Sequence, residues 1–474
     1  MGTVHAKSIS ESVTKENNAR PSYKNIPPPM KKRQQRESTK QVIHLEGIRA
    51  RVDKVHVDGL SRTKDDIIKA QVTELFKAEN FEDVVSVTQK VHSRLEALGC
   101  FKSIWVFIDT SRGPDASPEG VEVTFNVREL TRLAGEVSTM VGNNEGSLVV
   151  GVRAPNIFGR GEKLRMEYSY GNKSTTNINV SATKPFLSQN IDTILTGSVF
   201  NTSYDFPWSG YKQCDKGFLI DVSANTSSFL THTCQYEGVF RQIMATRQAS
   251  FAIREQCGPN LKSAFRHICT LDKRDSALFP TVGSLVKFST EVAGIGGDIG
   301  FVKNEFALQS NWTPHELCTF QLGFQAGLLR SITDNLKINI ADKFFLGGPM
   351  NLRGFDMRGC GPRDSGSSLG GDAYWAAALH MYTALPFLSA GSTFNKLFKL
   401  HGFVNGGNVV DFSFKSSEDY TKLFAHDVRC SIGAGIAMKL GNVARVELNF
   451  IHPLLFVKSD VLRPFQFGIG VQYL

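Results

Sequence analysis

The alternation of apolar and polar residues from residue 132 to residue 474 limits the possible folds of this chain more than any other feature. In the last ten residues every second position is apolar or aromatic, namely Phe465, Phe467, Ile469, Val471 and Tyr473. Successive side chains of a β-strand point to opposite faces, so this period predicts a strand with one apolar face. Sixteen or seventeen such stretches of about ten residues occur, separated by turns rich in Gly, Asn, Asp and Pro.

Two architectures can house so many strands. A soluble sandwich or propeller buries its apolar faces and leaves its polar faces in water. A transmembrane barrel reverses this arrangement, because its apolar side chains face lipid and its polar side chains line the lumen. A tilted membrane strand needs about 9–11 residues, whereas soluble strands most often have about 5–6. The length of the stretches, and aromatic residues such as Phe206, Trp208 and Trp312 near their ends, favour an antiparallel barrel of about sixteen strands in residues 131–474.

Residues 46–130 have a different pattern, which predicts a small α/β domain with the order β-α-α-β-β. A short alternating strand comes first, and two stretches with one apolar helical face follow it. Thr63 stands where it would cap the first helix, and Gly99 stands where it would end the second. Two further strands complete the unit, at residues 101–109 and 121–129.

Composition and motifs exclude several classes of function. Residues 1–50 hold ten Lys or Arg and four Glu. Residues 1–45 are predicted to be a disordered basic tail, and no nucleic-acid-binding module accompanies them, so no nucleic-acid partner is expected. The eight cysteines form no C-x-x-C pair, so neither a metal site nor a cofactor is predicted. No G-x-S-x-G, H-E-x-x-H or phosphate-binding motif is present, so the chain is not expected to be an enzyme.

A glycine-rich loop at about residues 330–371 interrupts the alternation. It contains Phe345-Leu-Gly-Gly-Pro-Met-Asn-Leu-Arg-Gly-Phe355. Long loops without regular structure are uncommon in compact proteins unless they have a task. Arg353 lies between glycine and aromatic residues, which indicates a loop that holds one cation in a defined place. The motif residues are therefore Leu352, Arg353, Gly354 and Phe355.

This motif, together with Phe345-Leu-Gly-Gly-Pro349 before it, resembles the signature loop of the family of outer-membrane barrel-assembly proteins. The unit at residues 46–130 is similar to the polypeptide-transport-associated domain of that family. A single such unit, and an N-terminus without the apolar core of a signal peptide, resemble the mitochondrial branch of the family. The resemblance extends from about residue 45 to residue 474.

The end of the chain also resembles the last-strand signal of mitochondrial barrel proteins. The positions of that signal are occupied here by Gln466, Gly468, Val471 and Tyr473. The resemblance implies a lateral gate at which the first strand, 134–142, and the last strand, 465–474, separate and pair with strands of a client. Glycine inside a strand weakens its pairing, so Gly468 and Gly470 fit a gate of this kind.

The resemblance further implies that the loop folds into the lumen and that Arg353 docks on the inner wall. A buried arginine needs an acceptor, because an unpaired buried charge is strongly destabilising. The family often supplies a carboxylate on the strand that matches residues 402–406, but this chain has an asparagine there. The candidate partners of Arg353 are therefore Asn405, Phe403 (by stacking), His380, Asp411 and Glu447.

By this resemblance the chain assembles and inserts β-barrel precursors, of the mitochondrial porin type, into the mitochondrial outer membrane. Its N-terminal domain would lie in the intermembrane space. The implied partners are the other subunits of the sorting and assembly machinery, the inner-membrane organising complex and the lipid bilayer. The alternative is a protein-translocating pore of the same family, used for import or secretion. A simple diffusion porin is disfavoured, because a loop inside the lumen opposes free flow.

Overall fold

A computed structural model of the chain describes residues 3–7, 48–112, 114, 116–142, 145–171, 175–186, 192–315, 318–333, 338–385, 394, 397–412, 417–441, 444–470 and 474. The chain divides into two compact units. Unit 1 contains residues 1–132 and 155–161, and unit 2 contains residues 133–154 and 162–474. Of the predicted basic tail, only residues 3–7 are among those described. In the described part of the chain, no helix is both long enough and apolar enough to span a membrane.

Unit 1 is a four-stranded sheet with two α-helices. Its elements are β1 (Thr3–Lys7), β2 (Arg51–Asp58), α1 (Asp65–Val72), the 3₁₀ helix η1 (Thr73–Lys77), α2 (Phe81–Leu98), β3 (Phe101–Thr110) and β4 (Gly120–Glu129). The sheet order is β1-β2-β4-β3, which leaves β3 at one edge. The β-α-α-β-β order predicted for this region is confirmed from β2 to β4.

The core of unit 1 follows from the apolar stripe of α2. Val84, Val91 and Leu95 recur at helical spacing and are fully buried, and Phe125 of β4 is equally buried. Gly99 ends α2 in the left-handed conformation, with φ 61°, as predicted.

The prediction that Thr63 caps α1 is wrong. The helix begins at Asp65, so Lys64 and not Thr63 is the N-cap residue. The side chain of Lys64 does not cap the helix by a hydrogen bond. The Thr63 hydroxyl instead donates a 2.7 Å hydrogen bond to Glu129 at the end of β4. A tertiary acceptor therefore replaces the local one, which sequence spacing alone could not reveal.

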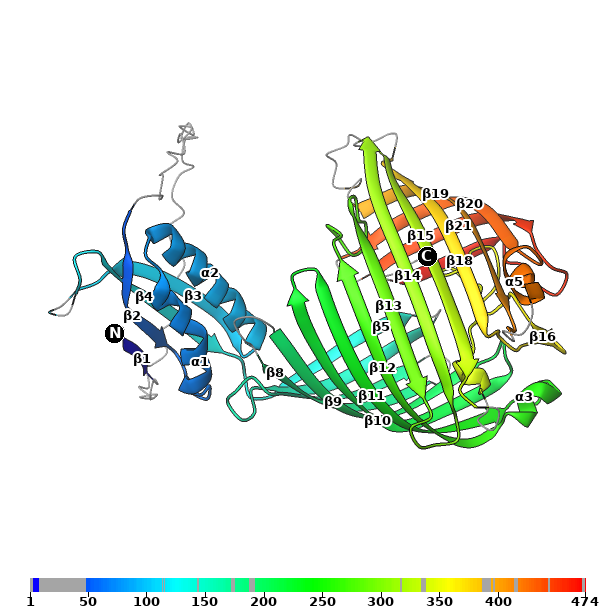
Figure 1. Cartoon of the computed structure of the whole chain (residues 1–474), viewed down its shortest axis with the longest axis horizontal. Helices are drawn as coiled ribbons and strands as arrows, with labels where there is room; N and C mark the ends of the chain where they lie inside the picture. Colours follow the sequence, from blue (N-terminus) through cyan, green and yellow to red (C-terminus); the bar gives the residue numbers. More distant parts are fainter. Residues whose placement is uncertain are drawn as a thin grey trace, which may run out of the picture. The chain divides into compact units, whose positions relative to one another are not determined.

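Unit 2 is one sixteen-stranded sheet whose strands curve around a common interior (Figure 1). Its strands are β5 (Ala134–Gly142), β6 (Glu145–Pro155), β7 (Lys163–Gly171), β8 (Thr176–Phe186), β9 (Asp192–Phe206), β10 (Tyr211–Ser227), β11 (Leu230–Ala245), β12 (Gly258–Asp272), β13 (Gly283–Ala293), β14 (Phe301–His315), β15 (Cys318–Ser331), β18 (Ala373–Thr383), β19 (Phe398–Val410), β20 (Arg429–Leu440), β21 (Ala444–Leu455) and β22 (Phe465–Gly470). Neighbouring strands are antiparallel, as in the register that pairs Ala134 of β5 with Arg153 of β6. The predicted number of strands and the predicted first strand are both confirmed.

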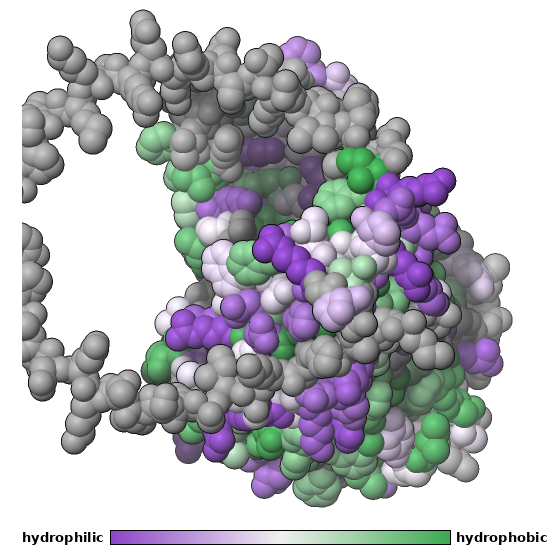
Figure 2. All heavy atoms as spheres, turned by 90° about the vertical axis from the view of Figure 1, so that its left-hand side faces the viewer, coloured by the Kyte–Doolittle hydropathy of each residue, from purple (hydrophilic) through white to green (hydrophobic). Residues whose placement is uncertain are grey.

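The alternation in unit 2 places apolar side chains outside and polar side chains inside. On β10, the outward residues Phe218, Ile220 and Val222 are 43%, 46% and 39% exposed. Asp221 and Ser223, which lie on the opposite face of the strand, are hydrogen-bonded to each other. This inverted pattern is typical of a barrel whose outer surface meets lipid. Figure 2 shows exposed apolar side chains in green beside polar ones in purple on one face of the molecule.

The connections of unit 2 carry its short elements. A short helix, α3 (Phe251–Glu255), joins β11 to β12, and α5 (Ser417–Phe424) joins β19 to β20. The longest connection runs from the end of β15 to the start of β18. It contains the 3₁₀ helix η2 (Ile340–Asp342) and the small hairpin of β16 (Arg363–Asp364) and β17 (Ser367–Ser368). This connection is the glycine-rich loop that the sequence singles out.

Candidate functional site

The long loop between β15 and β18 is folded back on itself by backbone bridges. Phe344 and Gly371 exchange two hydrogen bonds of 2.9 Å, and Leu346 pairs with Cys360. The motif residues Leu352 and Phe355 are completely buried in an apolar cluster with residues of the barrel wall. The loop is therefore a packed part of the interior, and the motif lies at its centre.

Only glycine fits the backbone conformation and the space at position 354. Its φ is +93°, a region that residues with a side chain rarely adopt. A Cβ atom at this position would lie 2.9 Å from Cγ2 of Ile451 and 3.1 Å from Cβ of Ser431. The absence of a side chain thus brings the loop backbone against β20 and β21, where Arg353 finds its partners.

Arg353 pairs with Glu447 of β21. Its Nη2 and Nε atoms donate to Oε2 of Glu447 at 3.0 Å and 3.2 Å, and both side chains are 0% exposed. Glu447 also meets Arg445, with 3.0 Å between Nη2 and Oε1, and accepts from Asn449 at 3.0 Å. A buried carboxylate with several donors satisfies a buried guanidinium, whereas either charge alone would be strongly destabilising.

Strands β19 and β20 hold the rest of Arg353. The guanidinium carbon lies 5.1 Å from the centre of the Phe403 ring, within the range of a cation–π interaction. The Ser431 hydroxyl donates to the Arg353 carbonyl at 2.6 Å. The amide of Asn405 fits when its nitrogen faces Ser431 and its oxygen accepts from the Arg353 backbone N–H at 2.7 Å. Asn405 therefore contacts the backbone of Arg353 rather than its charge.

His380 of β18 reaches the same centre through the last residue of the chain. Its Nε2 lies 2.5 Å from the carbonyl oxygen of Leu474, and Nη1 of Arg353 donates to that oxygen at 3.5 Å. Its Nδ1 lies 2.8 Å from Nε2 of His401, and the two imidazole rings are stacked. Both histidines are buried, so the wall beside Arg353 is aromatic as well as polar.

Asp411 was a wrong candidate for pairing with Arg353. It accepts a 2.9 Å hydrogen bond from Lys343 instead, and its side chain is 58% exposed. The reason is its place at the end of β19, since Asp411 follows the last strand residue, Val410. The buried guanidinium lies beside Glu447, in the interior of β21.

The last strand contacts the loop motif directly. Gln466 of β22 accepts from the Gly354 backbone N–H at 3.2 Å and donates to the Phe355 carbonyl at 2.6 Å. Gly468 lies opposite Glu447 in the register of β21 and β22, and Gly470 lies opposite Arg445. The other two residues predicted for the signal, Val471 and Tyr473, lie outside the described residues.

Comparison with known proteins places the chain in a family. A family model described as the Omp85 superfamily domain matches residues 156–473. The human "Sorting and assembly machinery component 50 homolog" is 39% identical over 478 residues, with 100% of both chains covered. A SAM50-like protein of Drosophila melanogaster is 35% identical over 436 residues, which cover 90% of this chain and 96% of the relative.

The chain belongs to the Sam50 family. This membership confirms the resemblance deduced from the loop motif, and it agrees with the prediction that the chain is not an enzyme. A solved structure, BamA from Haemophilus ducreyi lacking POTRA domains 1-3, matches with a TM-score of 0.71. The match covers 89% of this chain and 85% of that one, at 17% identity, which shows a shared barrel fold.

The sequence did not identify all members of this centre. Ser431, Arg445 and Asn449 complete the contacts of the loop motif and Glu447, and each of them is buried. Their polar character at inward positions was the available signal, but every barrel strand carries such residues. Within the described residues, no group of three or more His, Cys, Asp or Glu side chains could hold a metal ion. The contacts of the centre hold the loop on β20, β21 and β22.

Proposed function

We propose that this chain assembles β-barrel precursor proteins and inserts them into the mitochondrial outer membrane, by pairing their strands at a gate between β5 and β22. The family supports the general role, since relatives such as the human one are named components of a sorting and assembly machinery. The gate is the finer part of the proposal.

The two ends of the sheet carry this proposal. In the described residues the hydrogen-bonded order begins at β22 and ends at β5, so no ladder joins the two strands there. Nevertheless, Cα atoms of β5 and β22 approach within 8 Å of one another. Among the described residues, the wall is thus continuous except at one seam, where the two strands are close and no ladder joins them.

A seam of this kind suits the energetic problem of insertion. When a strand enters lipid, each unpaired N–H or C=O group raises the free energy by roughly several kcal/mol, the cost of moving an amide group from water into hydrocarbon. An edge strand offers partners for those groups, as in the strand additions of soluble recognition domains. Separation of β5 from β22 would provide two such edges inside the membrane, so a precursor strand could pair before it meets lipid.

Other parts of the chain extend the proposal. Unit 1 would act as a polypeptide-transport-associated domain in the intermembrane space. Its edge strand β3 presents Trp105 and Phe107, which are 64% and 59% exposed and lie two residues apart. Exposed apolar side chains on an edge strand favour the capture of extended segments. The partners would be precursors of the mitochondrial porin type, other subunits of the sorting and assembly machinery, and the inner-membrane organising complex.

Depletion of the protein tests this function. Mitochondria that lack it should accumulate unassembled porin, while import of a matrix protein continues at its normal rate. The matched control is re-expression of the intact chain, which should restore porin assembly. If matrix import fails first and porin still assembles, the chain is a translocating pore and the insertion proposal is wrong.

A further inference from the structure

A second charged residue of the long loop is buried in the barrel, far along the wall from the Arg353 centre. Asp342 ends the short helix η2 and is 4% exposed. The turn is fixed locally, since the side chain of Asn339 accepts from the Ala341 backbone N–H. Ile340 is fully buried against Tyr211 and Ile253. The first part of the loop is therefore attached to the barrel wall by contacts of its own.

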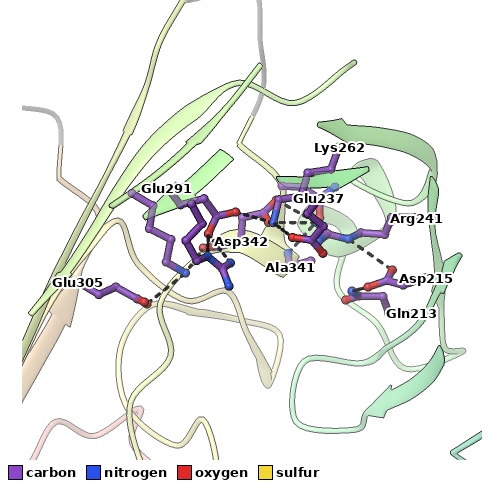
Figure 3. A network of polar contacts seen from close by, with 12 residues as sticks. Gln213, Asp215, Glu237, Arg241, Lys262, Glu291, Glu305, Ala341 and Asp342 are labelled. Atoms are coloured by element: carbon purple, nitrogen blue, oxygen red, sulfur yellow. Dashed lines mark hydrogen bonds and ion pairs between the residues drawn. The ribbon is translucent and has the colours of Figure 1, made fainter. Parts of the chain in front are cut away.

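Asp342 contacts cations from three strands. Nη1 of Arg241, on β11, lies 3.1 Å and 3.0 Å from its two carboxylate oxygens. Nζ of Lys262, on β12, lies 3.6 Å from Oδ1. Lys303, on β14, donates to the Asp342 backbone carbonyl at 3.0 Å. Figure 3 shows Asp342 and Ala341 on the loop facing Arg241 and Lys262.

The wall residues around Asp342 also pair among themselves. Arg241 lies 3.5 Å from Asp215, and Lys262 lies 3.6 Å from Glu237 and 2.7 Å from Glu291. We call the pairing residues of these strands the wall cluster; its members are Asp215, Glu237, Glu291 and Glu305 with Arg241, Lys262, Arg266 and Lys303. The wall cluster has four carboxylates and four cations, so it is balanced without Asp342.

This balance shows what Asp342 contributes. Removing a partner from a buried ion pair is most damaging when it leaves the other charge unpaired. Without Asp342, Lys262 keeps Glu291 at 2.7 Å. Arg241 loses its side-chain hydrogen bonds to Asp342 and keeps the ion pair with Asp215 at 3.5 Å. The carboxylate of Asp342 is thus a docking group that the loop supplies, and the barrel wall does not depend on it for neutrality.

The two buried charges of the loop bind different sectors of the wall. Asp342 meets β11, β12 and β14, whereas Arg353, eleven positions later, meets β21. Ordering a long loop is costly, and the cost rises with the length of free chain between fixed points. A fixed point at Asp342 leaves only a short segment to order before Arg353 reaches Glu447.

We propose that Asp342 is a second positioning residue of the loop, which holds the start of the loop on β11, β12 and β14 so that Arg353 reaches Glu447. The inference rests on the proposed function, because it assigns the loop a role in the insertion of precursors. In this arrangement the loop spans the interior from one sector of the wall to another. Loss of the first attachment loosens the second.

The native Cys360 reports on the docking of the loop. It lies in the loop and is 1% exposed. In the full chain reconstituted in lipid vesicles, with the other seven cysteines replaced, a maleimide should label Cys360 slowly. Asp342→Asn should raise the labelling rate roughly tenfold, the effect of losing a hydrogen-bonded charge contact, and slow the insertion of a porin-type precursor by a similar factor.

Two variants separate charge from mere packing. Asp342→Glu keeps the carboxylate, so the labelling rate of Cys360 and the rate of precursor insertion should both stay within about twofold of those of the parent. A neutral residue at this position should not preserve these rates. Asp364→Asn removes a carboxylate from β16 of the same loop, where its hydrogen-bond partner is the hydroxyl of the neighbouring Ser365, and should match the parent. If Asp342→Asn does not form a folded barrel, Lys303→Gln removes the donor to the Asp342 backbone carbonyl and is judged by the same rates; the carboxylate partner of Lys303, Glu305, is 46% exposed.

The outcomes distinguish this inference from the proposed function. The positioning role is overturned if Cys360 of Asp342→Asn is labelled as slowly as in the parent chain. It is also overturned if Cys360 of Asp342→Glu is labelled as fast as in Asp342→Asn. Fast labelling with an unchanged insertion rate overturns it too, because the loop would then be irrelevant to insertion, while the proposed function stands. If the parent chain itself does not insert the precursor, the proposed function fails whatever the labelling shows.

Discussion

Two glutamates, Glu447 in the barrel and Glu129 in the small α/β unit, each gather several donors and each fix a connecting segment. Glu447 is 0% exposed and depends on charged partners, Arg353 and Arg445, at 3.0 Å. Glu129 is 6% exposed and depends mainly on hydroxyl and backbone N–H donors, with Thr63 Oγ1 at 2.7 Å. The first contact is therefore vulnerable to loss of its counter-charge, and the second to protonation.

The largest effect should come from Arg353→Ala. It removes the guanidinium that faces Glu447 across a fully buried pair, and breaking such a pair by removal of one partner costs about 3–5 kcal/mol. We expect a barrel that unfolds at lower temperature in heat-modifiability gels and that assembles porin slowly or not at all. Arg363→Ala is the matched control. This arginine lies on the same loop and donates to the uncharged backbone carbonyls of Gly359 and Gly366, so its loss should cost only about 1 kcal/mol.

A normal rate of porin assembly in Arg353→Ala would contradict the dependence of Glu447 on its counter-charge. It would mean that Arg445 and Asn449 satisfy Glu447 without help and that the loop motif is a packing element only.

A smaller effect should follow from acid at Glu129. Burial alone would raise the pKa of its carboxyl, but hydrogen bonds from Thr63, Arg62 and Ser61 outweigh burial and lower this pKa to about 2. A lowered pKa stabilises the folded unit above the ordinary value of about 4.5. That contribution is lost as the pH falls from about 4.5 towards about 2, because the unfolded state then binds the extra proton more readily.

Hydrogen exchange of the Arg62 and Thr63 backbone amides in the full chain measures this change. After correction for the intrinsic rate, protection should fall by up to about tenfold for each pH unit below about 4.5. Glu129→Gln has no carboxylate to titrate, so its protection should not vary with pH in this range. Equal pH dependence in both proteins would show that another group controls the segment.

Local patterns in the sequence were sufficient for the barrel, but tertiary contacts were not readable from them. The alternation and the stretch length predicted a barrel of about sixteen strands, because period and length are properties of a strand itself. The loop motif likewise indicated Arg353. Its acceptor, Glu447, could not be chosen from the candidates, since it lies 94 residues away and faces the loop only through the register of β21.

Two other residues show the same limit. Thr63 was expected to cap α1, yet a carboxylate 66 residues away competes for its hydroxyl. Asp342 attracted no attention in the sequence, because a single acid in a loop is most often a solvated one. A signal was present in Ile340-Ala-Asp342-Lys-Phe344, where the acid and the neighbouring lysine lie between apolar residues. The role of Asp342 becomes visible only when the structure places it beside the inward-facing cations of β11 and β12.

The seam differs from both glutamate centres, since β5 and β22 approach each other without a ladder in the described residues. A disulfide across this seam tests whether the two strands must separate during assembly. Single cysteines are placed in Ala134–Thr139 and in Phe465–Gly470, in a chain without other cysteines, and pairs that crosslink are retained. The oxidised chain should bind a porin-type precursor but not release it as an assembled barrel, and a reductant should restore release. Full assembly activity in the locked form would contradict the gate.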